Sequence, residues 1–346
     1  MLKPSSFPGL KPQKQDNGLR LQMGPIQTIE RGQFRVAKSF PADLGIIALP
    51  YSQAQSLFLN TAIAHEIGHF AFQQVGLRQT IAKDVVSAVK AVLSTNNLQV
   101  VPDDLMWMID IVLKWAEELF CDLFAIWLVG PCFSLSFIEL FDMGYAMETP
   151  SSQVPFLRFY SEHPADLLRL QQHRVMLEHL GWWRAFGSVE SHYVSLLNRC
   201  QSLKETDFGI NTEKGDAIGK AIRSTFFNIV PSLHATVNSL FDKCESGAQE
   251  FEELSSTVEE YFWNGVVPST VFQSSKLVLR YPRVLTLLNT AAKVHISSLD
   301  KLLNQVAGGE PSSPSNRSEW TARLELWTIK ALEDSVILER TGQRWG

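Results

Sequence analysis

The chain has 346 residues, of which 45% are hydrophobic and 19% charged, and its formal net charge at pH 7 is −5. This composition suits a globular protein with a large core, in two domains or in one domain with a substantial extension. An acidic balance without a dense basic run argues against nucleic acid as a main partner. The four cysteines form no Cys-x-x-Cys pair, and no secretory signal opens the chain, so reduced thiols in a cytoplasmic protein are expected.

Residues 1–33 are rich in Pro, Lys, Gly and Gln and show no apolar periodicity, so they are expected to form an extended arm. Two short β-prone runs follow, Phe34 to Phe40 and Gly45 to Leu49. The segment between them, Pro41 to Leu44, has the composition of a turn. This pattern predicts a β-hairpin.

The segment Ser56 to Gln74 is predicted to be helical, because it lacks Pro and its apolar residues recur at helical spacing. The apolar residues Leu59, Ile63, Ile67 and Phe70 are expected to form the buried face. This face would point away from two histidines in the same segment. Further along, apolar residues at positions 81, 85, 89, 92 and 93 predict a second, amphipathic helix. It is expected to pack beside the first.

The first of these helices carries the sequence His65-Glu66-Ile67-Gly68-His69. Positions i and i+4 of a helix lie one above the other, so His65 and His69 can direct two nitrogen atoms at one zinc ion. Glu66 can then act as the base that takes a proton from a zinc-bound water. The competing interpretation is a core helix that carries two histidines without a metal.

A long apolar helix is predicted from Leu105 to Val129, with Asp103 or Asp104 as its N-cap and Gly130-Pro131 as its stop signal. The apolar run continues to Phe141 and is almost long enough to span a bilayer. Its acidic residues and Pro131 argue against a membrane-spanning role.

Three acidic residues lie within this apolar helix: Glu117, Glu118 and Asp122. Glu118 and Asp122 stand at i and i+4, so Glu118 can be a metal ligand and Asp122 can accept the free N–H of a ligating imidazole. Glu117 is expected to point about a quarter turn away. Burying such a pair without partners is costly, which favours packing against a cation. A solvated acidic strip is the alternative.

These residues resemble a known family. His65-Glu66-x-x-His69, followed 49 residues later by Glu118-Leu119-x-x-Asp122, is similar to the gluzincins, zinc peptidases whose third ligand is a Glu on a second helix. The resemblance implies that His65, His69 and Glu118 bind one Zn²⁺ per chain and that Glu66 is the catalytic base.

A second segment, Ser161-Glu162-His163-Pro164 with Arg169, is similar to the His-Pro and Arg segment of HtpX-like and CaaX-prenyl-protease-like peptidases. In those enzymes the His and Arg line the cleft, so the resemblance implies catalytic roles for His163 and Arg169. From the residues themselves, Pro164 would begin a helix that ends near Leu180-Gly181, and His163 would be its cap. Both interpretations stay open.

The resemblance covers about Phe34 to Gly181 and departs from the family at Cys121, where Ala is usual. The ImmA-type regulatory peptidases are a second similar group, because Glu118 to Asp122 runs on into Leu123-Phe124-Ala125. A three-histidine metzincin site is excluded, since it would need Gly and His at the positions of Phe72 and Val75.

Beyond Gly187 the pattern is helical, with Gly, Pro and Ser clusters between apolar repeats around Ser191 to Leu203, Ala217 to Phe241, Phe251 to Trp263, Val271 to Leu303 and Trp320 to Leu338. A flexible linker is predicted near 307–318. The remaining histidines stand singly and are interpreted as surface or core residues: His173, His179, His192, His234 and His295.

The sequence therefore predicts a mainly α (α+β) fold. An N-terminal arm (1–33) precedes a zincin-like catalytic domain with a small hairpin (34–187), and a C-terminal helical domain (188–346) follows. The predicted function is a cytoplasmic zinc-dependent endopeptidase that acts on a protein or peptide substrate. The alternatives are a zinc hydrolase of a non-peptide amide, and a non-catalytic zinc protein whose helical domain binds a protein partner.

Overall fold

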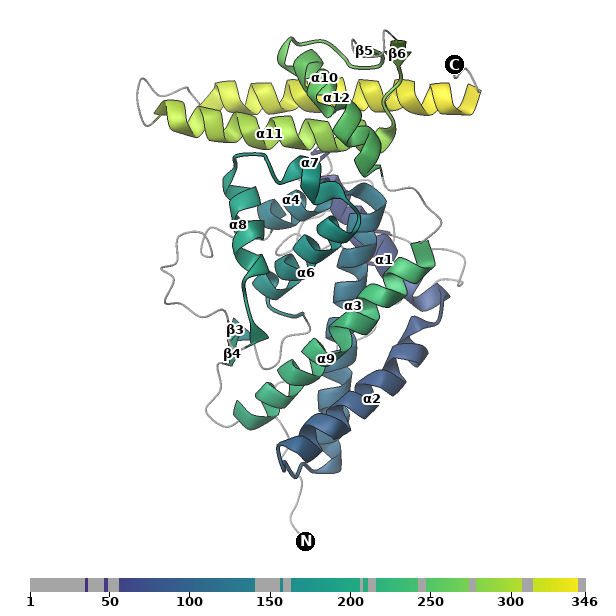
Figure 1. Ribbon diagram of the computed structural model, residues 1–346, viewed down its shortest axis with the longest axis vertical. Coiled ribbons are helices and arrows are strands. Elements are labelled where there is room, and N and C mark those ends of the chain that lie inside the picture. The colour runs from purple at the N-terminus through teal and green to yellow at the C-terminus, as the bar shows by residue number, and fades with distance from the viewer. Residues whose placement is uncertain are drawn as a thin grey trace.

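The computed structural model describes residues 35–36, 47–48, 56–140, 156–157, 163–205, 208–210, 216–241, 247–273, 278–306 and 314–341. Helices dominate these residues and the strands are short, so the mainly α fold class is confirmed (Figure 1). The predicted arm at 1–33 lies outside the described residues.

The first half of the described chain contains a 3-10 turn η1 (Leu59–Ala62) and the helices α1 (Ile63–Gln74), α2 (Leu77–Thr95), α3 (Pro102–Val129), α4 (Pro131–Leu140), α6 (Asp166–His179) and α7 (Trp182–Phe186). The second half contains α8 (His192–Gln201), α9 (Asp216–Phe241), α10 (Ala248–Trp263), α11 (Val284–Val306) and α12 (Pro314–Thr341).

The strands of the described residues form three pairs. Antiparallel pairs join β1 (Arg35–Val36) to β2 (Ile47–Ala48) and β5 (Val271–Gln273) to β6 (Val278–Arg280), and a parallel pair joins β3 (Phe156–Leu157) to β4 (Gly209–Ile210). The first pair, in which Arg35 faces Ala48, confirms the antiparallel pairing expected of the predicted hairpin, whose turn at Pro41 to Leu44 lies outside the described residues. The second antiparallel pair occupies residues for which the sequence predicts helix, so the helix predicted from Val271 is wrong at its start.

Helix α3 is the centre of the structure, and α1, α2, α6 and α9 pack around it (Figure 1). It is apolar on nearly all sides, as expected for a helix surrounded by others. Its N-cap is Val101, in extended conformation, and Pro102 takes the first helical position, where its missing N–H costs nothing. The predicted N-cap, Asp103 or Asp104, is therefore wrong, and both lie in the first turn, where they favour the helix dipole.

The end of α3 matches the predicted stop signal. Gly130 has a φ of 73°, a conformation that favours glycine, and α4 begins directly after it at Pro131. Asn289 of α11 holds this turn, because its side chain donates to the carbonyl of Val129 and accepts from the N–H of Cys132. A residue far along the chain thus fixes the angle between α3 and α4.

Helix α1 packs along α3, but not by the face that the sequence predicts. Its buried residues include Ala64, Gly68 and Phe72, whereas Ile67 is 37% exposed. The histidine side of α1 faces α3, so the predicted orientation of its apolar face is wrong. The reason is that the packing of two helices depends on small residues as well as on large apolar ones.

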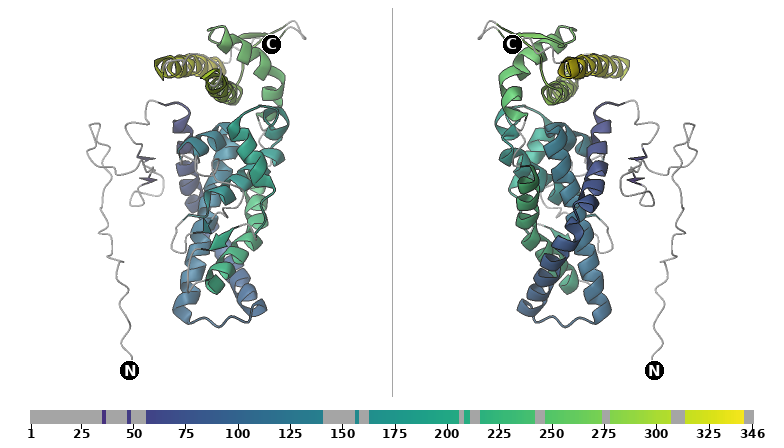
Figure 2. Two further views of the ribbon diagram at one scale, coloured as in Figure 1. Left: turned by 90° about the vertical axis from the view of Figure 1, so that its left-hand side faces the viewer. Right: turned by 90° about the vertical axis from the view of Figure 1, so that its right-hand side faces the viewer.

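The helices α11 and α12 lie side by side across one end of the molecule, roughly perpendicular to its long axis, and α10 packs against α11 (Figures 1 and 2). Residues 314–318, expected to belong to the linker, form the first turns of α12. Helices of the predicted C-terminal helical domain contact helices of the first half of the chain. Helix α8 packs on α6, and α9 packs on α2 and α3. Among the described helices, none is long and apolar enough to cross a bilayer.

Candidate metal centre

The two helices that carry the candidate ligands meet at Gly68 of α1 and Cys121 of α3. A Cβ atom placed on Gly68 would lie 2.8 Å from the Cα atom of Cys121 and 3.0 Å from its Cβ atom. These distances are shorter than real side chains tolerate, so only glycine at position 68 permits this approach. The close crossing brings His65 and His69, on either side of Gly68, against the acidic stretch of α3.

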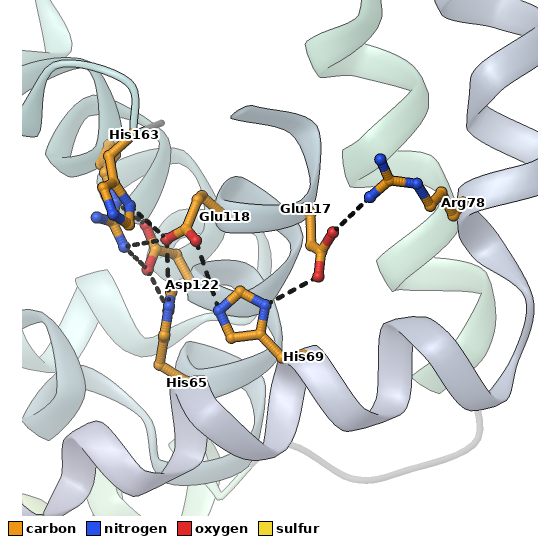
Figure 3. A network of polar contacts seen from close by, with 8 residues as sticks. His65, His69, Arg78, Glu117, Glu118, Asp122 and His163 are labelled. Carbon is orange, nitrogen blue, oxygen red and sulfur yellow. Dashed lines mark hydrogen bonds and ion pairs between the residues drawn. The ribbon is translucent and has the colours of Figure 1, made fainter. Parts of the chain in front are cut away.

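Both imidazoles direct Nε2 at the carboxylate of Glu118 (Figure 3). Nε2 of His65 lies 3.4 Å from Oε2 of Glu118, and Nε2 of His69 lies 3.5 Å from Oε1. The two rings stand edge to face, with centroids 5.0 Å apart. All three side chains are largely buried, with 12% to 19% of each exposed.

These separations can be compared with those of a zinc site. Nitrogen and oxygen ligands at about 2.0 to 2.2 Å, in tetrahedral directions, stand roughly 3.4 Å from one another. Each imidazole lies at this spacing from Glu118, His65 from Oε2 and His69 from Oε1. His65, His69 and Glu118 therefore suit a divalent ion by donor type and by proximity.

The other nitrogen of each imidazole donates to a second carboxylate. His65 donates its Nδ1–H to Oδ1 of Asp122 over 2.8 Å, and His69 donates its Nδ1–H to Oε1 of Glu117 over 3.1 Å (Figure 3). A carboxylate can only accept, so these bonds place a proton on each Nδ1, and each Nε2 is the atom that would offer a lone pair to a metal. Both rings are thus fixed in the tautomer and orientation that a metal requires.

Asp122 is fully buried and is held by a second layer of side chains from α6. Arg169 donates to it twice, through Nε and Nη2, each over 2.6 Å, and Nε2 of His173 lies 3.2 Å from its Oδ2. Arg169 is 3% exposed and stacks on the ring of Phe137 at 4.6 Å. Glu117 has a more exposed partner, since Nη1 of Arg78 lies 3.2 Å from its Oε2.

The electrostatics of the cluster favour positive charge between the histidines. Burial alone lowers the pKa of His65, but hydrogen bonds to Asp122 and Glu118 outweigh it and raise the pKa to about 9. Burial opposes the ionisation of Glu118, yet His163 and His65 hold its pKa well below the ordinary value. Asp122 is likewise buried, and Arg169 holds its pKa well below the usual range.

The formal charges point to a divalent cation. Four carboxylates lie around Cys121, those of Glu66, Glu117, Glu118 and Asp122. Among the described residues, the guanidinium groups of Arg78 and Arg169 contact carboxylates of this set. When the imidazoles are neutral, as they would be in binding a metal, four negative and two positive groups leave a formal charge of −2. An ion of charge +2 would balance it, which agrees with the cost of burying unpaired charge.

The two residues from the His-Pro and Arg segment take different positions. Helix α6 begins at Asp166 with Ala165 as its N-cap, so the interpretation of His163 as the cap is wrong. Nδ1 of His163 instead lies 3.0 Å from Oε2 of Glu118, and 57% of its side chain is exposed, which places it at the rim of the site. Arg169 is buried, donates to Asp122 and has its Nη2 3.7 Å from Oε2 of Glu118, so it contacts both acidic residues of the site. Its implied catalytic role stays a prediction.

The sequence pattern does not predict the contacts of two residues of this cluster. Glu117 is predicted to point away from the site, but it accepts the Nδ1–H of His69. His173 stands singly in the sequence, but it contacts Asp122. Its position four residues after Arg169 is the available signal, because i and i+4 share one helix face.

Comparisons with protein-family models, with curated proteins and with solved structures give no match for this chain. The chemistry of the site therefore has to be inferred from its own residues. The site combines two imidazoles oriented by hydrogen bonds to Asp122 and Glu117 with the carboxylate of Glu118, which both Nε2 atoms face. Glu66, next to His65 on α1, is 9% exposed.

Proposed function

We propose that this chain is a zinc-dependent peptidase of the gluzincin type, with α1, α3 and α6 as a zincin-like core. One observation supports this above all. Nε2 of His65 and Nε2 of His69 face the carboxylate of Glu118 at 3.4 and 3.5 Å, while both Nδ1 atoms are anchored. Three protein ligands of this kind leave a fourth position for water or substrate, which distinguishes catalytic from structural zinc sites.

In this proposal His65, His69 and Glu118 hold the ion. Once bound, zinc would supply a Lewis acid for the scissile carbonyl and a water molecule whose pKa is about 7. Asp122 and Glu117 keep the imidazoles aligned and make them stronger metal ligands, because each carboxylate accepts an Nδ1–H. Arg169 keeps Asp122 ionised and in place.

Glu66 handles the proton. Its carboxylate, one residue after His65 and on the same helix, takes a proton from the attacking water and returns it to the nitrogen of the leaving amine. His163 contributes from the rim. Because it contacts Glu118 through Nδ1 and is 57% exposed, its imidazole is available to donate to the carbonyl oxygen of the substrate as negative charge develops there.

The first prediction tests the metal and the base together. Purified protein is expected to contain one zinc per chain, and Glu118→Gln is expected to lose most of it. Glu66→Gln should keep the zinc and the fold but lower turnover by at least about 100-fold, the usual range for a lost general base. The measurements are elemental analysis, circular dichroism and mass spectrometry of new termini in a peptide library made from a proteome.

The matched pair of carboxylate variants separates metal binding from proton transfer. New termini made equally fast by the wild type and by Glu66→Gln would contradict the peptidase and leave a non-catalytic zinc protein. Full zinc occupancy in Glu118→Gln would contradict the ligand set.

A further inference from the structure

Cys121 is a fourth potential ligand at the crossing of α1 and α3. It follows Glu118 by three residues on α3, so the two side chains share one side of the helix. It is fully buried and packs against Gly68, between the two histidines. Ligand atoms of His65, His69 and Cys121 all lie within 4.8 Å of one another.

A thiol that coordinates a divalent ion is deprotonated outright, so binding of a metal at this position would be coupled to the loss of the Cys121 proton.

We infer that Cys121 closes the metal centre as a fourth protein ligand, which fits a borderline or soft divalent cation such as Zn²⁺ or Co²⁺. The inference rests on the metal site of the proposed function but not on its peptidase chemistry. When the ion binds, the S–H bond breaks, the proton passes to solvent and a sulfur–metal bond forms. No oxidation or reduction takes place.

The required movement is small. Zinc–sulfur bonds of about 2.3 Å and zinc–nitrogen bonds of about 2.0 Å, in tetrahedral directions, place sulfur and nitrogen roughly 3.6 Å apart. The sulfur therefore has to approach the imidazoles by no more than about 1.2 Å from the observed limit of 4.8 Å. Rotation about the Cα–Cβ bond of Cys121 can supply such a movement.

The closed centre has a functional consequence. Four protein ligands fill a tetrahedral site, so water or a substrate carbonyl reaches the ion only when the thiolate leaves. Turnover by the proposed peptidase would then be limited to the fraction of molecules in which Cys121 has left the ion. A thiolate ligand also favours softer ions over Mg²⁺ and Ca²⁺, which prefer oxygen.

Cobalt substitution tests this inference without an activity assay. The metal-free, reduced protein is loaded with one equivalent of Co²⁺, and its near-ultraviolet and visible absorption is recorded. A thiolate-to-cobalt charge-transfer band is expected in the wild type and should be absent in Cys121→Ser and Cys121→Ala. The control variants Cys132→Ser, Cys200→Ser and Cys244→Ser should keep the band.

X-ray absorption of the zinc-loaded wild type adds a test that needs no variant. One sulfur neighbour at about 2.3 Å is expected beside nitrogen and oxygen neighbours. Bound cobalt without the charge-transfer band, or zinc without a sulfur neighbour, would overturn the inference and leave the His, His, Glu centre of the proposed function intact. A wild type that binds neither ion would overturn both.

Discussion

At the scale of single residues, the two carboxylates that hold the histidines differ in their surroundings. Asp122 is fully buried and contacts His65, Arg169 and His173. Glu117 contacts His69 and Arg78, and 46% of the Arg78 side chain is exposed. The charge of Glu117 is therefore better screened, and we expect it to contribute less than Asp122 to the binding of a metal.

Glu117→Gln is expected to weaken zinc affinity by about 10-fold, the lower end of the range for residues that orient a ligand. The amide oxygen still accepts the Nδ1–H of His69, but the negative charge that strengthens the imidazole as a donor is lost. Competition with a chromophoric chelator measures the change. Asp110→Asn is the control, because Asp110 also lies on α3 and its Oδ1 is 3.6 Å from Arg78. An equal loss in the control would assign the effect to Arg78.

The sequence predicts part of this cluster for a physical reason. The spacings of His65 with His69 and of Glu118 with Asp122 lie within single helices, where one turn fixes which side chains are neighbours. The contact of Glu117 with His69 depends on how α1 crosses α3, and that angle follows from the approach at Gly68. A pattern along one helix does not contain this information.

At the scale of helices, the crossing of α1 and α3 depends on Gly68. Gly68→Ala is expected to lower the free energy of unfolding by about 1 to 3 kcal/mol, the usual cost of overpacking, because the new Cβ would lie against the backbone of Cys121. Urea denaturation of the metal-free protein measures it. Gln73→Ala, at an exposed position of the same helix, should be nearly neutral. Equal stability of the two variants would show that the helices can separate without cost.

Helix α12 supports the beginning of the segment that leads to α1. Oε1 of Glu325 accepts from the hydroxyl of Ser56 over 2.9 Å and from the N–H of Leu57 over 3.0 Å. Two donors that precede η1 are thus satisfied by a residue of the C-terminal layer. The contact resembles a helix cap supplied by a distant part of the chain.

Glu325→Ala is expected to lower the free energy of unfolding by about 0.5 to 2 kcal/mol, the range for a lost cap. Thermal and urea denaturation check this value. Glu333→Ala is the control, since Glu333 lies on the same helix with 61% of its side chain exposed. A loss of the same size in both variants would point to the helix propensity of α12 rather than to the contact with Ser56 and Leu57.

The sequence predicts which segments are helical better than it predicts where helices begin and what connects them. The stop of α3 at Gly130 follows from local backbone preferences, and the structure has it there. Residues 271–273 and 278–280 form antiparallel strands although their short apolar runs also suit a helix, an ambiguity that periodicity alone does not resolve. The start of α3 at Pro102 shows the same limit, because two acidic residues after the proline suit a cap as well as a first turn.

At the scale of the whole molecule, side chains from distant segments join the layers. Asn289 fixes the turn between α3 and α4, and His295 contacts Glu139 of α4 over 3.0 Å and stacks on Phe58. The buried apolar side chains of the described residues form one cluster that extends from Phe58 to Ala331. The sequence predicts the apolar faces but not these long-range pairings, since each needs the position of both partners.

One such pairing makes the stability of the whole molecule depend on pH. His234 of α9 donates from Nε2 to Oε1 of Gln172 on α6, over 3.0 Å. Burial, aided by the nearby His179, lowers the pKa of His234 to about 4. In the unfolded chain the pKa of a histidine is about 6.5. Between these two values the unfolded chain binds a proton that the folded protein does not.

Above about pH 6.5, His234 is neutral in both states and does not lower the free energy of unfolding. As the pH drops from 6.5 toward 4, the unfolded chain takes up a proton and the free energy of unfolding should fall. The contribution is at most about 3.5 kcal/mol, from 1.4 kcal/mol per unit of pKa difference. Asp122 and Glu118 affect stability at lower pH, because their pKa values lie well below the ordinary ones.

Urea denaturation of the wild type and of His234→Gln between pH 4 and 7.5 is the measurement, with His192→Gln, at an exposed position, as the control. The wild type and the control should lose stability more steeply than His234→Gln on acidification, and parallel curves for all three would show that His234 does not titrate differently in the folded protein.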